Sequence, residues 1–391
     1  MSRRLYRTSP RARIALAFAS LGCALPWTSM AVAQEAAASL YVRNDSDRTT
    51  VITPRARVDV PVGEDTSVGL VYMVDVWTSA SVDIRTSASR RISGSDFGAR
   101  RVTEQRDEID VGLGHDLHGV RLTGEYRYST EPDYESHGGA VGAEIDLANK
   151  SALLAVTARA NFDRVGRAGA PDFQRPVDVL GGRVAFTQIL DPQTLVQGIY
   201  ELASADGYLS SPYRYVGVGT DDSTCRVDGD DDELLYCVPE NNPEGRLSHA
   251  LALRGRRALG GALSVGAGYR FYVDDWELSS HTVQVDLAWA LLQDSLLTLR
   301  YRFYTQGEAY FFERAYLEER DDGLYTRDKE LSPLDSHRVG LDLERRFELG
   351  GSGERLKVVL GLGGTHYTYD DYALLDSVTA LEATLATVLE L

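Results

Sequence analysis

One hairpin, residues 281–304, constrains the fold of this chain more than any other stretch. From His281 to Leu291, the odd-numbered residues after the histidine are apolar or aromatic, and the residues between them are polar or alanine. Successive side chains of a strand point to opposite faces, so this segment has one apolar and one polar face. Residues 292–295 reverse the chain, and residues 297–304 alternate again. Strands of about ten residues can cross a bilayer when they are tilted by about 45°.

Similar alternation recurs throughout the chain and defines a series of strand candidates. They are residues 39–43, 50–62, 67–76, 109–113, 120–128, 141–147, 154–162, 180–186, 195–202, 247–253, 263–273, 281–291, 297–304, 339–347, 356–362 and 381–391. Short links alternate with long polar connections, residues 80–103, 163–177, 204–246 and 305–335, as periplasmic turns alternate with outer loops. The sequence therefore predicts an all-β fold, a transmembrane antiparallel up-and-down β-barrel of about 16 strands, with 14 as the alternative.

A soluble β-sandwich also alternates, but its apolar faces pack inward and its connections are not sorted by length. In this chain, charges of both signs occupy the middle of strands, where they fit a wet or salt-bridged lumen. The residues that we expect to line this lumen are Arg55, Arg57, Asp75, Glu125, Arg127, Arg159, Arg183, Arg270, Asp286, Arg300 and Arg302.

Charge and hydropathy exclude two other classes of protein. The net charge is −17, and a nucleic-acid-binding surface normally shows as a basic excess, so no nucleic-acid partner is expected. No run of about eighteen apolar residues follows the N-terminal segment, so helical membrane spans are not expected.

Residues 1–33 have the organisation of a secretory signal peptide. Five arginines precede a short apolar stretch, residues 14–27, and Ala31-Val-Ala33 forms an A-x-A cleavage site. A lipoprotein signal ending at Cys23 is the weaker alternative. We expect residues 34–391 to form the barrel in the outer membrane of a Gram-negative cell. Its expected partners are outer-membrane lipid, the barrel-assembly machinery and an unknown small polar solute.

The connection 204–246 carries two further candidate sites. Cys225 and Cys237 would be the two cysteines of the mature chain, and a disulfide between them is expected in an oxidising compartment. Asp228, Asp230 and Asp232 are oxygen ligands of the kind that Ca²⁺ prefers, although their spacing does not complete an EF-hand loop. A solvated acidic surface is the simpler interpretation, and no other cofactor is indicated.

Aromatic residues fall into two groups. Those near strand ends are expected to form membrane-interface belts. Tyr310, Phe311, Phe312 and Tyr316 lie instead inside the long connection 305–335. They could fold into the lumen as a constriction or bind a ligand, or they could pack on the barrel rim. Residues 208–215, which include Arg214, are a second candidate for an inward-folded loop.

Adjacent serine and histidine residues occur at Ser248-His249, Ser280-His281 and Ser336-His337. Neighbours in a strand point to opposite faces, so none of these pairs can act as nucleophile and base. We therefore identify no catalytic residues, and enzymatic activity is not expected.

Six segments spread over the chain carry a family resemblance. They are residues 49–54 (TTVITP), 75–81 (DVWTSAS), 207–214 (GYLSSPYR), 279–282 (SSHT), 301–306 (YRFYTQ) and 325–333 (YTRDKELSP). In them the chain resembles the domain of unknown function 3570 family of bacterial outer-membrane proteins. The resemblance implies an outer-membrane barrel over nearly the whole mature chain and supplies no catalytic residues.

Three functions remain open at this point. The leading hypothesis is a pore or solute channel whose charged lumen acts on a polar solute. The alternatives are a closed barrel that serves as a scaffold or binds a partner through its long loops, and an outer-membrane hydrolase.

Overall fold

The computed structural model describes residues 35–79, 102–219, 221, 236–350 and 353–391. They belong to the compact unit Val32–Leu391, and the other unit, Met1–Ala31, lies outside the described residues, as do the predicted signal peptide (1–33) and most of the connection 80–103. Within the described part of the chain, no helix is long and apolar enough to cross a membrane.

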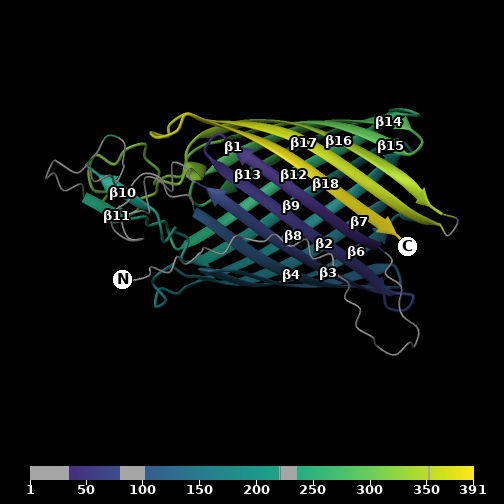
Figure 1. Cartoon of the computed structure of the whole chain (residues 1–391), viewed down its shortest axis with the longest axis horizontal. Helices are drawn as coiled ribbons and strands as arrows, with labels where there is room; N and C mark the ends of the chain where they lie inside the picture. Colours follow the sequence, from purple (N-terminus) through teal and green to yellow (C-terminus); the bar gives the residue numbers. More distant parts are fainter. Residues whose placement is uncertain (1–34, 80–101, 220, 222–235, 351–352) are drawn as a thin grey trace, which may run out of the picture. The chain divides into compact units, whose positions relative to one another are not determined.

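Sixteen strands of the described residues close into one antiparallel barrel (Figure 1). They are β1 (Glu35–Asp45), β2 (Thr49–Pro61), β3 (Thr66–Ser79), β4 (Val102–Leu117), β5 (Val120–Glu131), β6 (Tyr134–Leu147), β7 (Ala152–Val165), β8 (Arg175–Asp191), β9 (Thr194–Gly207), β12 (Gly245–Gly260), β13 (Leu263–Asp274), β14 (Ser279–Leu292), β15 (Ser295–Gln306), β16 (Leu334–Leu349), β17 (Glu354–Tyr369) and β18 (Ser377–Glu390). The predicted fold and strand number are confirmed.

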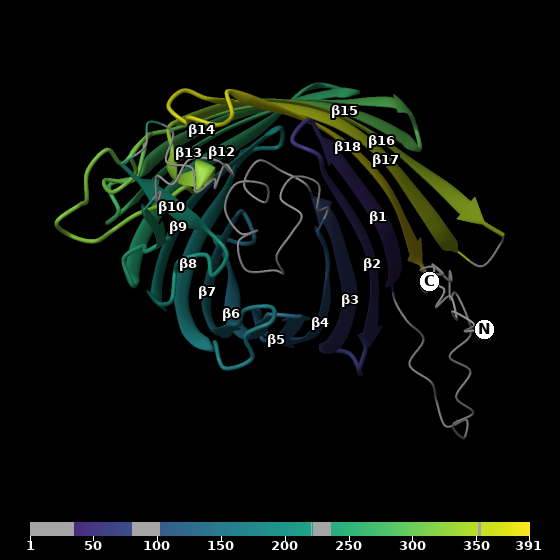
Figure 2. The same ribbon diagram turned by 60° about the vertical axis from the view of Figure 1, so that its left-hand side comes forward.

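The first and last strands close the barrel. β1 pairs with β18 from Glu35↔Glu390 to Asp45↔Ala380, and the two ribbons lie side by side in Figure 2. Every other strand pairs with its sequence neighbour, except that β9 pairs with β12. This happens because β10 (Tyr215–Val218) and β11 (Tyr236–Pro239) form a separate two-stranded sheet within the intervening connection. Closure leaves no free edge, so every strand of the barrel has partners on both sides.

The apolar face of the strands points out of the barrel. In β14, Val283, Val285, Leu287 and Trp289 are 41%, 42%, 40% and 51% exposed, and no second layer of described residues covers them. The same holds for strands around the whole barrel, where Leu70, Val111, Tyr126, Val184, Leu253 and Leu341 are exposed as well. A continuous apolar exterior is unfavourable in water and favourable in hydrocarbon, which is the arrangement of an outer-membrane barrel.

The strands extend beyond the apolar segments that reveal them in the sequence. The three long connections in the described residues therefore shrink to 166–174, 208–244 and 307–333. Links at the opposite end are tight hairpins such as residues 118–119 and 293–294. In the described residues, one end of the barrel thus carries short turns, and the other carries the long loops.

Candidate functional site in the lumen

Three consecutive rows of side chains cross strands β12 to β16 on the interior face. In the central row, Arg254 lies opposite Gly268, Gly268 opposite Gln284, Gln284 opposite Arg302, and Arg302 opposite Arg338. The row on one side contains Arg270, Thr282 and Tyr304, and the row on the other contains Arg256, Gly266, Asp286 and Arg300. Because register is fixed by the apolar outer face, these polar residues must share the inner face.

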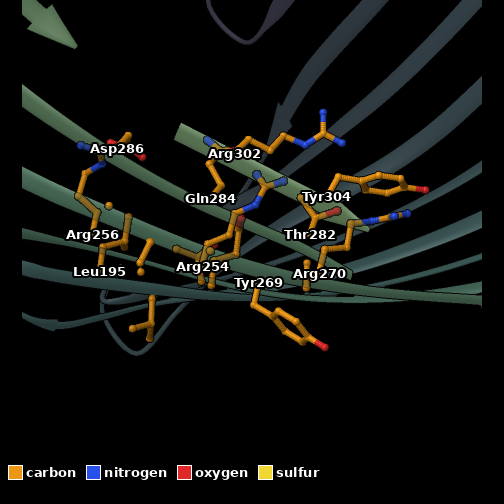
Figure 3. A pocket seen from close by; sticks show the side chains of 18 of the residues that line it. Leu195, Arg254, Arg256, Tyr269, Arg270, Thr282, Gln284, Asp286, Arg302 and Tyr304 are labelled. Carbon is orange, nitrogen blue, oxygen red and sulfur yellow. The ribbon is translucent and has the colours of Figure 1, made fainter. Parts of the chain in front are cut away.

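These rows form the floor of a cavity of about 740 Å³. Figure 3 shows Arg254, Arg270, Arg302 and Tyr304 on one side of the strands, whereas Tyr269 points away from them on the other. A second cavity of about 550 Å³ shares Arg270, Arg302, Tyr304 and Arg338 with the first. The interior next to β12–β16 is therefore hollow, polar and rich in guanidinium groups.

Most charged side chains of this wall are held by cross-strand ion pairs. Arg256 pairs with Asp286, and Arg300 with Asp342. A further pair joins Arg338 Nη2 to Glu382 Oε2 at 2.7 Å, and Arg246 Nη2 lies 2.5 Å from Asp274 Oδ2. Glu201 is shared by Arg183 at 3.5 Å and Arg270 at 3.4 Å. Neither Arg254 nor Arg302 forms an ion pair with any of the described residues, so the wall as a whole is basic.

Strands β2 to β5 carry a more acidic set of interior charges. Arg106 Nη2 lies 2.6 Å from Asp75 Oδ2, and Thr53 donates to the same carboxylate. Arg127 bridges Asp110 at 2.7 Å and Glu125 at 3.0 Å. Arg57 and Asp59 pair at 2.5 Å within β2. On this side Arg57, Arg106 and Arg127 each have at least one carboxylate partner, in contrast to Arg254 and Arg302 in the wall over β12–β16.

Glycines allow charged side chains to lie flat across the neighbouring strand. A Cβ at Gly266 would collide with the Asp286 carboxylate, and one at Gly363 would lie 3.2 Å from both Arg338 Nη2 and Glu382 Oε2. A side chain at Gly266 would displace the Asp286 carboxylate from its present position, and one at Gly363 would crowd the pair of Arg338 and Glu382.

The interior face holds all eleven predicted lumen residues, since each has the parity opposite to the exposed apolar side chains of its strand. Only Arg270, Asp286 and Arg302 among them line the two large cavities. The sequence reasoning missed Arg246, Arg254, Arg256 and Arg338, which also line them. Arg254 and Arg256 follow the predicted end of a strand at 253, and Arg338 precedes the predicted start of another at 339. Extending the alternation by a few residues would have found them.

The four aromatic residues of the predicted constriction lie outside the cavities. Phe311 and Phe312 are 0% and 5% exposed, in a cluster with Trp276, Tyr369 and residues of neighbouring loops at the strand ends. Tyr316 is fully buried in a second cluster with Val216, Val218 and Tyr325, and Tyr310 is 43% exposed. The structure therefore agrees with packing on the barrel rim and not with an aromatic constriction. The loop does reach the second cavity, but through Asp328, Glu330 and Leu331.

Two long loops at this end join through a buried carboxylate. Glu240 is 3% exposed and accepts hydrogen bonds from Ser211 N at 2.8 Å, Thr326 Oγ1 at 2.7 Å and Arg214 Nη1 at 3.1 Å. Backbone bridges Val218↔Tyr316 and Asn241↔Tyr325 add to this contact. The predicted inward segment 208–215 is thus part of a packed loop layer, in which Arg214 also contacts Asp328 at 3.1 Å. Burial raises the pKa of the Tyr316 hydroxyl in the same layer.

Histidines and tyrosines pair on the outside of the barrel. The hydroxyls of Tyr126, Tyr200, Tyr269 and Tyr301 lie 2.7 to 2.8 Å from Nδ1 of His137, His249, His281 and His337, respectively. The partners come from adjacent strands near the long-loop end, as expected for a membrane-interface belt.

Ser280 and Ser336 line the second cavity, on the face opposite their histidine neighbours, as alternation requires. Tyr304, Tyr367 and Tyr369 are also aromatics near strand ends, but they line that cavity and so do not belong to the expected interface belt.

The disulfide and calcium predictions both involve residues outside the described part of the chain. Cys237 lies in β11, whereas Cys225, Asp228, Asp230 and Asp232 lie outside the described residues. Both therefore stay predictions. A different group could approach a cation: carboxylate oxygens of Glu104, Glu131 and Asp133 lie within 4.8 Å of one another, and Tyr213 donates to Asp133.

Comparison with known proteins agrees with this architecture. Residues 177–360 match a family model described as protein of unknown function (DUF3570), which confirms the family resemblance. No curated protein matches the chain.

Among solved structures, a bacterial polysaccharide outer membrane secretin is 8% identical with a TM-score of 0.50, over 92% of this chain and 99% of that one. A mutant of the ferric enterobactin receptor PfeA from Pseudomonas aeruginosa is 12% identical with a TM-score of 0.44, over 87% and 54%. OpdK from Pseudomonas aeruginosa with vanillate is 8% identical with a TM-score of 0.44, over 90% and 97%. The chain thus spans about half the length of the enterobactin receptor. These similarities concern the fold alone, an outer-membrane-type β-barrel.

Proposed function

We propose that this barrel, whose residues 177–360 match the DUF3570 family, is a pore for small polar solutes in the outer membrane. The observation that carries the proposal is the hollow interior beside β12–β16. Its two cavities of about 740 and 550 Å³ share Arg270, Arg302, Tyr304 and Arg338, so they lie next to each other along the lumen wall. A lumen lined by charged groups replaces part of the hydration of a polar solute, and this lowers the cost of its passage.

The two sides of the lumen would place the solute in a transverse electric field. The basic side is β12–β16, and the acidic side includes Asp75, Asp110 and Glu125. Charges that face each other across a narrow aqueous path orient a dipolar solute and slow an apolar one. Selectivity for polar molecules would follow from this arrangement.

Planar-bilayer recording of the refolded full-length protein tests the proposal. Discrete current steps are expected once the protein inserts. Protein that is folded, as shown by its heat-modifiable migration in gels, and that gives no current would contradict a pore.

A second candidate function is a closed barrel that binds a partner through its outer loops. It is favoured by the packed loop layer, in which connections 208–244 and 307–333 are held together by the buried Glu240. Such a surface is ordered before a partner arrives, which lowers the entropic cost of binding. Crosslinking on intact cells that recovers a specific partner, together with absence of current, would favour this function over a pore.

The proposal also places the mature chain in the outer membrane after cleavage near Ala33. Cell fractionation followed by N-terminal sequencing is expected to find Gln34 as the first residue. A product found in the soluble periplasm would contradict the membrane location.

A further inference from the structure

We infer that the lumen wall over β12–β16 contains a binding site for small oxyanions, solutes that carry a carboxylate or phosphate group. The site consists of Arg254, Arg270, Arg302 and Arg338, here called the basic wall. It rests on the proposed pore function only in that the solute would reach it through the lumen.

The charge of the larger cavity is the first observation. Among the described residues, five arginines and a single carboxylate, that of Asp286, line it. Asp286 is already paired with Arg256, so the four arginines of the basic wall face the cavity without another lining carboxylate. A chain with a net charge of −17 thus concentrates positive charge at one place in its interior.

The register shows that this concentration is costly without a counter-ion. Arg302 and Arg338 are directly opposite each other on adjacent strands, where like charges repel. Glu382 compensates Arg338 at 2.7 Å, but Arg302 has no carboxylate partner among the described residues. An oxyanion between the two strands would supply the missing charge.

Cation–π contacts hold two of the guanidinium groups beside the cavity. The guanidinium carbon of Arg302 lies 5.6 Å from the ring centre of Tyr304, and that of Arg270 lies 5.5 Å from the ring centre of Tyr272. The planar fork of a guanidinium carries N–H donors that match the two oxygens of a carboxylate or phosphate. The wall is therefore oriented for oxyanions and would repel small cations.

The distance between the arginines of the central row limits the size of the ligand. Arg254 and Arg302 are separated by three strand spacings, roughly 14 Å in all along the sheet. Gly268 and Gln284 lie between them, so the centre of the row has one position without a side chain and one neutral donor and acceptor. A dicarboxylate or a phosphorylated small molecule fits between these two arginines better than a lone chloride ion does.

Binding is tested directly on folded, detergent-solubilised full-length protein with inorganic phosphate and succinate as probes. Line broadening of ³¹P resonances and calorimetric titration measure affinity whether or not the barrel conducts. Arg254→Gln with Arg302→Gln is expected to weaken binding of both probes by at least about tenfold, because charge-assisted hydrogen bonds are lost. The variant Arg302→Lys keeps the charge but loses the forked N–H donors. Its affinity for both probes should lie between those of the natural protein and the double variant.

Arg55→Gln is the matched control, since Arg55 is an exposed interior arginine of β2 that lines neither large cavity. It should bind both probes as the natural protein does. No measurable binding, or equal loss in the control and the double variant, would overturn the inference. Binding without any current would reject the pore and leave the oxyanion site standing, so the two proposals fail separately.

Discussion

The buried carboxylate of Glu240 gives the sharpest prediction about stability. Replacing Glu240 by Ala removes the acceptor for Ser211 N, Thr326 Oγ1 and Arg214, and Thr326 is itself 0% exposed. Each buried donor left without an acceptor costs about 1 to 3 kcal/mol. Arg214 keeps Asp328 as a partner at 3.1 Å, so the loss is set by Ser211 N and Thr326 Oγ1 and should total about 4 kcal/mol. Because these contacts join loops and not barrel strands, the loss should appear as local opening of the loop layer, with the barrel intact.

Hydrogen exchange of the refolded protein in detergent measures this opening. The amides of Gly219, Asn241 and Tyr325 donate across the two loops and report on their contact. A loss of about 4 kcal/mol corresponds to exchange roughly a thousandfold faster at these amides, at about 1.4 kcal/mol per tenfold. Amides in the centre of the barrel strands should exchange as before.

Glu244→Ala is the matched control, because this exposed carboxylate lies four positions along the same loop and its side chain forms no hydrogen bond or ion pair with the described residues. It should leave exchange unchanged at all three amides. Unchanged exchange in Glu240→Ala, or faster exchange of barrel amides as well, would refute the view that Glu240 holds a separate loop layer together.

Two further predictions concern the barrel wall. Gly266→Ala should displace the Asp286 carboxylate and lower the free energy of unfolding by about 1 to 3 kcal/mol in urea titrations, as overpacking does elsewhere. Gly112→Ala, where an added methyl group meets no atom within 4 Å, is the control, and an equal effect of both changes would contradict the close approach at Gly266. Tyr269→Phe should cost about 0.5 to 1.5 kcal/mol in the same titration by removing its bond to His281, and no loss would show that the pair is not formed in the membrane.

The strands were predictable because one face of each must meet hydrocarbon. That requirement makes apolar and polar residues alternate in segments such as 281–291, and this alternation can be recognised without knowing which strand is the partner. The strand ends were not predictable in the same way. β12 and β16 run on to Gly260 and back to Leu334, respectively, where the strands no longer show strict apolar alternation.

The basic wall was found only in part for this reason. Arg270 and Arg302 lie within predicted strands, whereas Arg254 and Arg338 lie just outside them. The alignment of Arg254 with Arg302 depends on the register of four strands, which side-chain alternation alone does not determine.

The long loops were the least predictable part. The aromatics Phe311 and Tyr316 looked suited to a constriction, but each is buried against another loop, Phe311 against Trp276 and Tyr316 against Val216 and Val218. Contacts between residues far apart in sequence leave no periodic signal. The contacts of Glu240 have the same character, since its partners Arg214 and Thr326 come from two separate connections.

The central claim is that apolar side chains of the barrel face outward to lipid and polar side chains face the lumen. Spin labels along β14 test this claim most directly. Single nitroxide labels at positions 283–287 of the full-length protein in liposomes are compared by their accessibility to oxygen and to a water-soluble nickel complex. Labels at the odd-numbered positions should be accessible to oxygen from the lipid, and those at 284 and 286 should be accessible to the nickel complex in the lumen. Equal accessibility at all five positions, or alternation of the opposite sign, would contradict the account.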